Sequence, residues 1–265
     1  MANIKSGRFP RTKEFSERFD FGFDDFQIEG CRAVESGHGV LVAAPTGAGK
    51  TIIGEFAVFL ALQQGVKCFY TTPIKALSNQ KFQELVAVYG DEKVGLLTGD
   101  SSINSEAPIV VMTTEVLRNM IYAESSTLKN LEYVVMDEVH YLADRFRGAV
   151  WEEILIHLPE RIQVISLSAT VSNAEEFAEW LNSVRGDTHI VLSEIRPVPL
   201  YQHVLMGNRL LDLFTESGRV NPEVLRLEKE SVSRLRTPNQ RHWASAERSS
   251  LQGKLLSKPE IVEKL

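Results

Sequence analysis

A short glycine-rich segment near the start of the chain is typical of a phosphate-binding loop. It consists of Ala44, Pro45, Thr46, Gly47, Ala48, Gly49, Lys50 and Thr51. It follows the apolar run 40–43 and precedes a helix expected over 52–62. In such a turn the backbone N–H groups point inward, and the helix N-terminus adds partial positive charge. Lys50 is expected to reach the β- and γ-phosphates of a nucleotide, and the Thr51 hydroxyl to bind Mg²⁺.

One position departs from the usual pattern, because Ala44 stands where a Gly begins the strict motif. Gly47 and Gly49 still allow the backbone to approach phosphate closely. The alternative is an ordinary Gly-rich turn with a solvated Lys50. The order of strand, turn and helix favours the phosphate-binding interpretation.

A second acidic segment, Asp137-Glu138-Val139-His140, follows another apolar strand. Opposite a phosphate-binding loop, Asp137 is expected to hold Mg²⁺ and Glu138 to orient or deprotonate the attacking water. The alternative is an Asp-Glu pair that caps a helix. His140 is either a neutral core residue or a link to another element. A metal role for His140 is not expected, because no second His or Cys stands at ligand spacing.

Hydroxyl groups end a further strand at Ser168 and Thr170. We expect them to hydrogen-bond the acidic segment and so couple the nucleotide site to the rest of the molecule. A serine nucleophile is excluded, because the Gly-x-Ser-x-Gly elbow is absent.

Upstream of the loop, Phe21 and Gln27 suggest a pocket for the base. A Gln amide carries both a donor and an acceptor and therefore matches the edge of adenine, and Phe21 can stack on the ring. From these residues alone, packing in the core is the competing interpretation.

Three further segments carry residues suited to a nucleic-acid backbone, which proteins contact through phosphates and sugars. Two open helices and the third lies between them. The candidates are Thr72, Pro73, Lys75, Thr98, Gly99, Thr113, Thr114 and Arg118. Taken one at a time, each hydroxyl could instead be a helix N-cap.

Short apolar strands alternate with helices through most of the chain, which predicts βαβ units and a mainly parallel sheet covered by helices on both faces. Ligands then bind at the carboxyl ends of the strands, where the phosphate-binding loop, Asp137 and Ser168 lie. The expected strands are 40–43, 67–71, 94–97, 109–113, 133–136, 163–167 and 189–192, and the expected helices are 52–62, 75–89, 114–122, 148–158 and 174–184.

Composition indicates an ordinary globular protein. The 265 residues carry a net charge of −6, with 43% hydrophobic and 24% charged residues. Two cysteines, Cys31 and Cys68, cannot build a disulfide framework, which suits a reducing compartment. Without a signal segment or a long apolar run, we expect a cytoplasmic protein that has no membrane contact. We also expect it to act as a monomer.

Three regions follow from this pattern. Residues 1–20 are expected to form a charged, irregular tail, and residues 21–196 the nucleotide-binding domain. Residues 197–265 begin with two prolines and then become polar, which predicts an irregular extension. Within it, residues 207–256 are interpreted as a mobile linker, with a nucleic-acid contact as the alternative. Pro259–Leu265 is expected to begin a helix.

Together the motifs resemble those of superfamily 2 helicases over about residues 15–206. The stretches TTPIKALSNQK, LLTGDSSIN, VMTTEVLRNM, DEVHYLADRFRGAVWEE and LSATVSNAEEFAEWL are similar to superkiller-type DEVH-box RNA helicases, above all to the bacterial HelY-type members. The resemblance implies a RecA-like P-loop NTPase domain that uses ATP and Mg²⁺. It also assigns Phe21 and Gln27 to the adenine site.

The resemblance further implies ATP-driven translocation, 3′ to 5′, on single-stranded RNA. It implies a second RecA-like domain with arginine fingers, which this sequence does not include, so we expect the chain alone to be weakly active or inactive. Two alternatives stay open: a DNA repair helicase or translocase of the same superfamily, and a nucleotide-gated scaffold that binds nucleic acid without a motor role.

Overall fold

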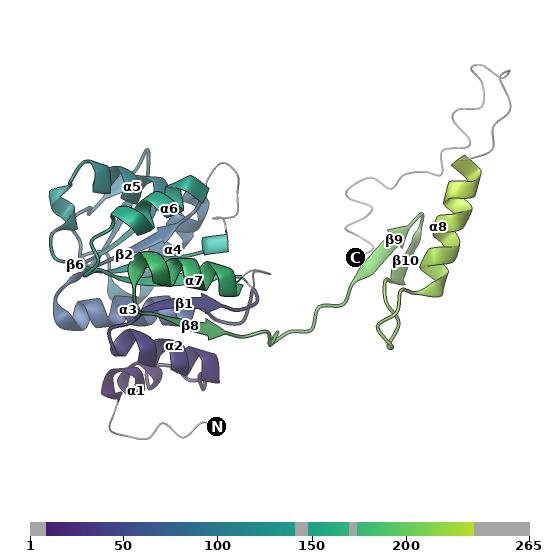
Figure 1. The fold of residues 1–265 in the computed structure, drawn as a ribbon, viewed down its shortest axis with the longest axis horizontal. Helices are drawn as coiled ribbons and strands as arrows, with labels where there is room; N and C mark the ends of the chain where they lie inside the picture. Colours follow the sequence, from purple (N-terminus) through teal and green to yellow (C-terminus); the bar gives the residue numbers. More distant parts are fainter. Residues whose placement is uncertain (1–8, 141–147, 170–173, 236–265) are drawn as a thin grey trace, which may run out of the picture. The chain divides into compact units, whose positions relative to one another are not determined.

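The computed structural model describes residues 9–140, 148–169 and 174–235. The chain divides into two compact units, Met1–Pro197 and Val198–Leu265. The first unit contains an eight-stranded sheet, and the second a two-stranded sheet with one helix (Figure 1).

The large sheet has the strand order β4-β3-β5-β2-β6-β7-β1-β8, and every neighbouring pair is parallel except β3 with β4. The predicted α/β fold is confirmed, and only the short antiparallel edge strand β4 was not expected. The strands are β1 Gly39–Ala43, β2 Lys67–Thr72, β3 Val94–Leu97, β4 Ser102–Ile103, β5 Ile109–Thr113, β6 Leu131–Met136, β7 Gln163–Ser168 and β8 Thr188–Leu192.

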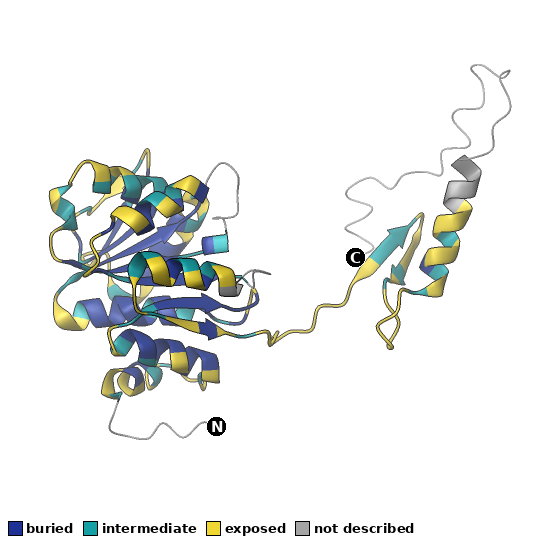
Figure 2. Cartoon of the chain, viewed as in Figure 1, coloured by how far each residue is buried: buried dark blue, intermediate teal, exposed yellow. Residues whose placement is uncertain are grey.

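Helices cover both faces of this sheet, because strand side chains alternate between two apolar clusters. In β2, Tyr70 faces the cluster formed with α1–α4, and Phe69 faces the cluster formed with α5–α7. The central strands are buried throughout (Figure 2). The helices are α1 Pro10–Ser16, α2 Asp25–Glu35, α3 Thr51–Gln64, α4 Lys75–Tyr89, α5 Thr114–Tyr122, the 3₁₀ turn η1 Ser126–Leu128, α6 Gly148–His157 and α7 Ala174–Arg185.

The prediction of an irregular tail over residues 1–20 is wrong for the described part, because α1 packs against the domain. The carboxylate of Glu35, at the end of α2, accepts hydrogen bonds from the backbone N–H groups of Arg11 (2.9 Å) and Thr12 (2.8 Å). Phe15 is 2% exposed and joins a cluster of aromatic rings that includes Phe56 and Phe59. A distant carboxylate and buried rings thus fix a segment whose own sequence is mostly polar.

The second unit corrects the prediction of a linker over 207–256 in its described part, residues 207–235, which contains regular secondary structure. Strand β9, His203–Met206, pairs with β10, Arg209–Asp212, in a separate antiparallel hairpin. Gly207 lies at the turn with φ +62°, where glycine is favoured. Helix α8, Pro222–Leu235, follows. The helix expected over Pro259–Leu265 lies outside the described residues.

The carboxyl ends of the parallel strands place the predicted motifs side by side. The ends of β6, β7 and β1 adjoin one another in the sheet, and so do the ends of β3, β5 and β2. Thr72 of β2 pairs in register with Thr113 of β5, and Leu97 of β3 with Met112 of β5. One edge of the sheet therefore carries two adjacent groups of loops.

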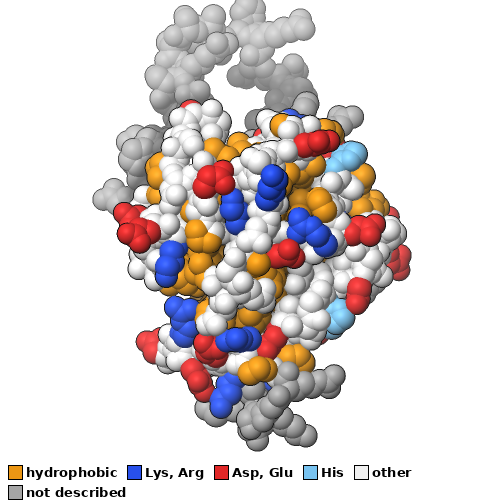
Figure 3. Space-filling view, turned by 90° about the vertical axis from the view of Figure 1, so that its left-hand side faces the viewer, with side chains coloured by type: hydrophobic (Ala, Val, Ile, Leu, Met, Phe, Trp, Pro, Cys, Tyr) orange, Lys and Arg blue, Asp and Glu red, His pale blue; other side chains and the backbone are white. Residues whose placement is uncertain are grey.

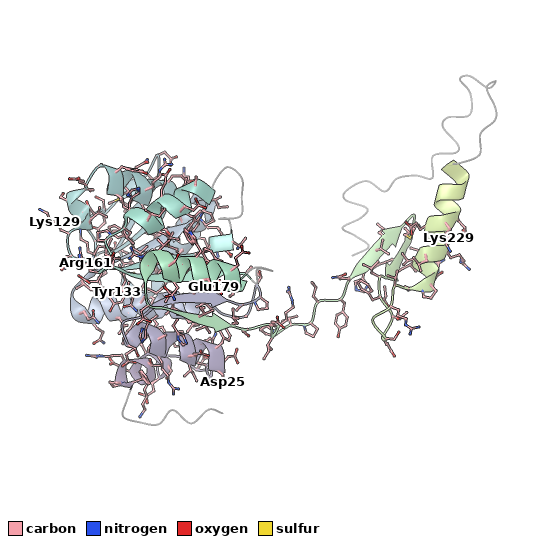
Figure 4. All side chains as sticks on the ribbon, viewed as in Figure 1. Asp25, Lys129, Tyr133, Arg161, Glu179 and Lys229 are labelled. Atoms are coloured by element: carbon pink, nitrogen blue, oxygen red, sulfur yellow. The ribbon has the colours of Figure 1, made fainter. Side chains whose placement is uncertain are left out.

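Lys129, Tyr133 and Arg161 lie on the opposite side of the sheet, near the amino ends of β6 and β7 (Figure 4). On the face shown in Figure 3, positive and negative side chains are interspersed and do not gather into a basic patch. In the described ranges, no helix combines the length and the apolar character needed to cross a membrane.

Candidate functional site

The phosphate-binding loop has the backbone shape that its glycines allow. Gly47 and Gly49 adopt φ values of +84° and +81°, which strain any residue with a side chain. A Cβ on Gly49 would stand 2.5 Å from Nε2 of Gln27, so a larger residue there would displace the end of that side chain. The loop is anchored to β7 by a hydrogen bond from the N–H of Ala44 to the carbonyl of Ser168 (3.1 Å).

Lys50 immediately precedes α3 and is only 7% exposed. Over the part of the chain that the structure describes, no carboxylate forms an ion pair with it. A largely buried ammonium needs an anionic partner, and the neighbouring helix N-terminus also favours an anion. This arrangement suits the phosphates of a bound nucleotide.

Asp137, directly after β6, is held by two hydrogen bonds. Its Oδ1 accepts the N–H of Glu138 (2.9 Å), and its Oδ2 accepts the hydroxyl of Tyr70 (3.0 Å). Burial raises the pKa of Asp137 above its ordinary value, and the neighbouring Glu138 carboxylate raises it further. A nearby cation would offset both effects, as expected for a carboxylate that faces a metal ion.

Glu138 lies in the left-handed region of backbone space with φ +57°, which is uncommon for a residue with a side chain. Such strain persists only where the surroundings hold it, and it gathers at functional sites. Oε2 of Glu138 stands 3.1 Å from Nδ1 of His140, so the predicted water-activating and coupling residues are adjacent.

The residues present fit Mg²⁺. Within the ranges that the structure covers, no group of three or more His, Cys, Asp or Glu could hold a metal ion by itself. Mg²⁺ at phosphate sites is usually held by one or two protein groups together with the substrate phosphates. Asp137 after β6 and Thr51 at the start of α3 could supply those groups.

Gln27 has a structural role that its sequence context did not predict. It is 5% exposed; its Nε2 donates to the carbonyl of Gly49 (3.0 Å) and its Oε1 accepts the N–H of Asp24 (2.9 Å). The amide therefore joins the start of α2 to the phosphate-binding loop, and Oε1 keeps a second lone pair. Phe21 is 50% exposed and lies against Phe19 and Phe23. A contact of either residue with adenine stays a prediction.

Ser168 ends β7 beside the loop but does not bond the acidic segment through its hydroxyl. Its Oγ donates instead to the carbonyl of Ala169 (2.8 Å). Thr170, its predicted partner in coupling, lies outside the described residues. The backbone carbonyl of Ser168, bonded to Ala44, is the connection that the structure does contain.

At the neighbouring loops, three threonines that were predicted to contact nucleic acid are buried, and their hydroxyls form hydrogen bonds within the protein. Oγ of Thr72 stands 2.7 Å from the Ser78 hydroxyl, that of Thr114 donates to the carbonyl of Thr72 (3.1 Å), and that of Thr98 donates to Asp100 (3.1 Å). The bond from Thr114 to Thr72 ties the ends of β2 and β5 together.

The same edge also presents an exposed Lys75, a half-buried Arg118 and two helix starts. Lys75 opens α4 and pairs with Asp100, and Arg118 lies 3.7 Å from a carboxylate oxygen of Glu153. Pro73 precedes α4, and a Cβ on Gly99 would meet no atom within 4 Å. Thr113 is the N-cap of α5 by position, but its side chain makes no capping hydrogen bond.

Three residues of the site were missed by sequence reasoning: Tyr70, Glu55 and Lys81. Tyr70 reaches Asp137, and the buried Lys81 pairs with Glu55 of α3 at 3.4 Å. The available signal was a Tyr beside Cys and Phe in a strand expected to be buried, because a buried phenol usually needs a polar partner.

Comparison with known proteins assigns a class to this fold and site. The family described as DEAD/DEAH box helicase matches residues 24–177, which is more than half of the chain. The chain therefore belongs to the DEAD/DEAH box helicases.

More specific similarities lie within this class. The chain is 55% identical over 258 residues to the probable helicase HelY of Mycobacterium leprae, covering 94% of this chain and 28% of that protein. It is 47% identical over 188 residues to the ATP-dependent RNA helicase mtr4 of Schizosaccharomyces pombe, covering 71% and 17%. Among solved structures, the DUF1998 helicase MrfA bound to DNA superposes with a TM-score of 0.57 at 25% identity, covering 70% and 29%.

The predicted likeness to HelY-type helicases is confirmed by these comparisons. The chain spans less than a third of the length of each of these relatives.

Proposed function

We propose that this chain is the ATP-binding RecA-like domain, over residues 21–196, of an ATP-driven helicase that moves 3′ to 5′ along single-stranded RNA. One observation carries the proposal: two groups of loops share a sheet edge and meet where the N–H of Asp137 bonds the carbonyl of Thr71 (3.0 Å). Asp137 of the nucleotide site is thus bonded to the residue next to Thr72, at the end of β2 that faces the proposed nucleic acid. The similarity to the ATP-dependent RNA helicase mtr4 favours RNA as the nucleic acid.

In the nucleotide half, the loop Ala44–Thr51 cradles the phosphates, and Lys50 neutralises their charge. Bound Mg²⁺ supplies further charge neutralisation, and Thr51 and Asp137 hold it. Glu138 accepts a proton from, or orients, the water that attacks the γ-phosphate, with His140 beside it. Phe21 stacks on the adenine ring, and Gln27 meets its edge through the remaining acceptor site on Oε1.

In the loops proposed to contact nucleic acid, the hydroxyls of Thr72, Thr98 and Thr114 are used in internal hydrogen bonds. Backbone groups and cations are therefore left to contact the nucleic acid. The first N–H groups of α4 and α5 can donate to phosphates, as helix starts generally do. Lys75 and Arg118 would exchange their present carboxylate partners for phosphate.

The proposed motor needs a second domain. Translocation requires two parts that close and open around nucleotide while each grips the strand. We propose that a second RecA-like domain of the same full-length protein provides the arginine fingers, as the greater length of the relatives suggests. The full-length protein is proposed to act as a monomer in the cytoplasm.

Competition between matched single strands tests the choice of nucleic acid. At one stated salt concentration, we expect RNA to stimulate ATP hydrolysis by the full-length protein about tenfold better than DNA of the same sequence. Two hydrogen bonds to 2′-hydroxyls, each about 0.7 kcal/mol, suffice for that factor. The salt concentration must be equal in both arms, because the phosphate contacts are salt-dependent.

Equal or stronger stimulation by DNA would favour the second candidate, a DNA helicase or translocase. That candidate has one specific support, the similarity to a structure of a DNA-bound helicase. Strand binding gated by nucleotide, without unwinding of any duplex, would instead indicate a scaffold.

A further inference from the structure

Tyr70 lies in the middle of β2 and is fully buried in the cluster beneath α3 and α4. Its hydroxyl nevertheless reaches a polar group, Oδ2 of Asp137, at 3.0 Å. A phenol has a hydrogen to donate and an ionised carboxylate has none, so the bond runs from the phenol to the carboxylate.

Both carboxylate oxygens of Asp137 accept a hydrogen bond. Oδ2 accepts the phenol hydroxyl, while Oδ1 accepts the N–H of Glu138 at 2.9 Å. Two donors on two different oxygens fix the rotation of the carboxylate plane. Each oxygen keeps a lone pair for a further partner. The orientation of that remaining acceptor surface is thus set before any nucleotide arrives.

The phenol ring itself has little freedom to move. Gly54 of α3 leaves space for the ring, because a Cβ there would stand 3.3 Å from Cε2 of Tyr70. On the α4 side, Nζ of Lys81 lies 5.4 Å from the ring centroid, within the range of a cation–π contact. Carboxylates of Glu55 and Glu84 hold that ammonium at 3.4 and 2.5 Å. The donor is therefore built into the packing between the two helices and the sheet.

We propose that Tyr70 is a positioning residue for the nucleotide site: its hydroxyl holds the Asp137 carboxylate in the orientation that receives Mg²⁺ on the nucleotide. This inference rests on the proposed function. Groups that orient a metal-binding side chain are commonly worth about 10- to 100-fold in metal affinity or activity.

A Tyr70→Phe substitution tests this role, because it removes the hydroxyl and keeps the ring. The readout is the Mg²⁺ concentration that half-saturates tight binding of a fluorescent ADP analogue to the 265-residue chain. We expect it to rise at least about tenfold. Affinity for the analogue in EDTA is expected to stay within about twofold, since the phosphate-binding loop is untouched.

Tyr133→Phe is the matched control. Tyr133 is also a buried tyrosine of the sheet, but its hydroxyl bonds Oε1 of Gln64 (3.1 Å) on the side where Lys129 and Arg161 lie (Figure 4). Its loss is expected to leave the Mg²⁺ requirement unchanged.

Three results would overturn the role of Tyr70: an unchanged Mg²⁺ requirement in Tyr70→Phe, an equal rise in Tyr133→Phe, or an equal loss of affinity in EDTA, which would indicate general disruption. The unsubstituted chain separates this inference from the proposed function. If the unsubstituted chain binds the analogue weakly and its affinity does not depend on Mg²⁺, the nucleotide site itself is refuted.

Discussion

Replacing Lys50 by Ala is expected to weaken binding of Mg·ADP or Mg·ATP at least about 30-fold. Lys50 is largely buried at the start of α3, and over the described ranges no carboxylate pairs with it. Truncating one partner of a buried charge pair typically costs about 2–5 kcal/mol, and 2 kcal/mol already corresponds to about 30-fold. Titration of the chain with a fluorescent nucleotide measures the dissociation constant directly.

Lys129→Ala is the control for this experiment, since it makes the same change of charge. Lys129 is exposed and lies on the opposite side of the sheet (Figure 4). Its replacement is expected to leave nucleotide affinity within about twofold, because exposed charges beyond the Debye length of about 8 Å are largely screened. A dissociation constant for Lys50→Ala that matches the unsubstituted chain would refute the phosphate-binding loop.

Replacing Glu138 by Gln is expected to reduce ATP turnover by the full-length protein about 10²- to 10⁴-fold while nucleotide binding is kept. Glu138 is held beside His140 by a strained backbone with φ +57°, and an amide cannot take the proton of the attacking water. Glu138→Asp keeps the charge but shortens the reach, so it is also expected to be damaging. Steady-state hydrolysis and nucleotide titration, measured on the same preparation, separate the two effects.

Glu124→Gln offers a matched control. Glu124 has a similar left-handed backbone, with φ +47°, but it is exposed and follows α5. If both substitutions lowered turnover alike, the effect would reflect strain or net charge rather than activation of water. Near-normal turnover in Glu138→Gln would remove that residue from the reaction.

Local pattern predicted most of the fold because the large sheet is buried on both faces. Its strands are continuous apolar runs, so their positions and the loops at their ends could be read without knowing the pairing. The phosphate-binding loop and the acidic segment could be predicted equally well, because the functional groups of each lie within a few adjacent residues.

Features that depend on contacts between residues distant in the sequence could not be predicted. Helix α1 is fixed by a carboxylate from Glu35 and by rings of α3, neither of which its own sequence reveals. The bond from Tyr70 to Asp137 joins residues 67 positions apart and depends on β2 lying next to β6. Thr72 and Thr114 were predicted to contact nucleic acid because their hydrogen-bond partners come together only in the folded chain. These partners are the hydroxyl of Ser78 and the carbonyl of Thr72.

The central claim is that this chain carries one half of an ATPase site whose other half lies on a second domain. The most direct test compares RNA-stimulated ATP hydrolysis by the 265-residue chain with that of the full-length protein at saturating Mg·ATP. Arginine fingers contribute about 10³- to 10⁵-fold in other nucleotide hydrolases. The chain alone is therefore expected to bind nucleotide but to turn over at most about a thousandth as fast, with no response to RNA. Robust RNA-stimulated turnover by the 265-residue chain would contradict this account.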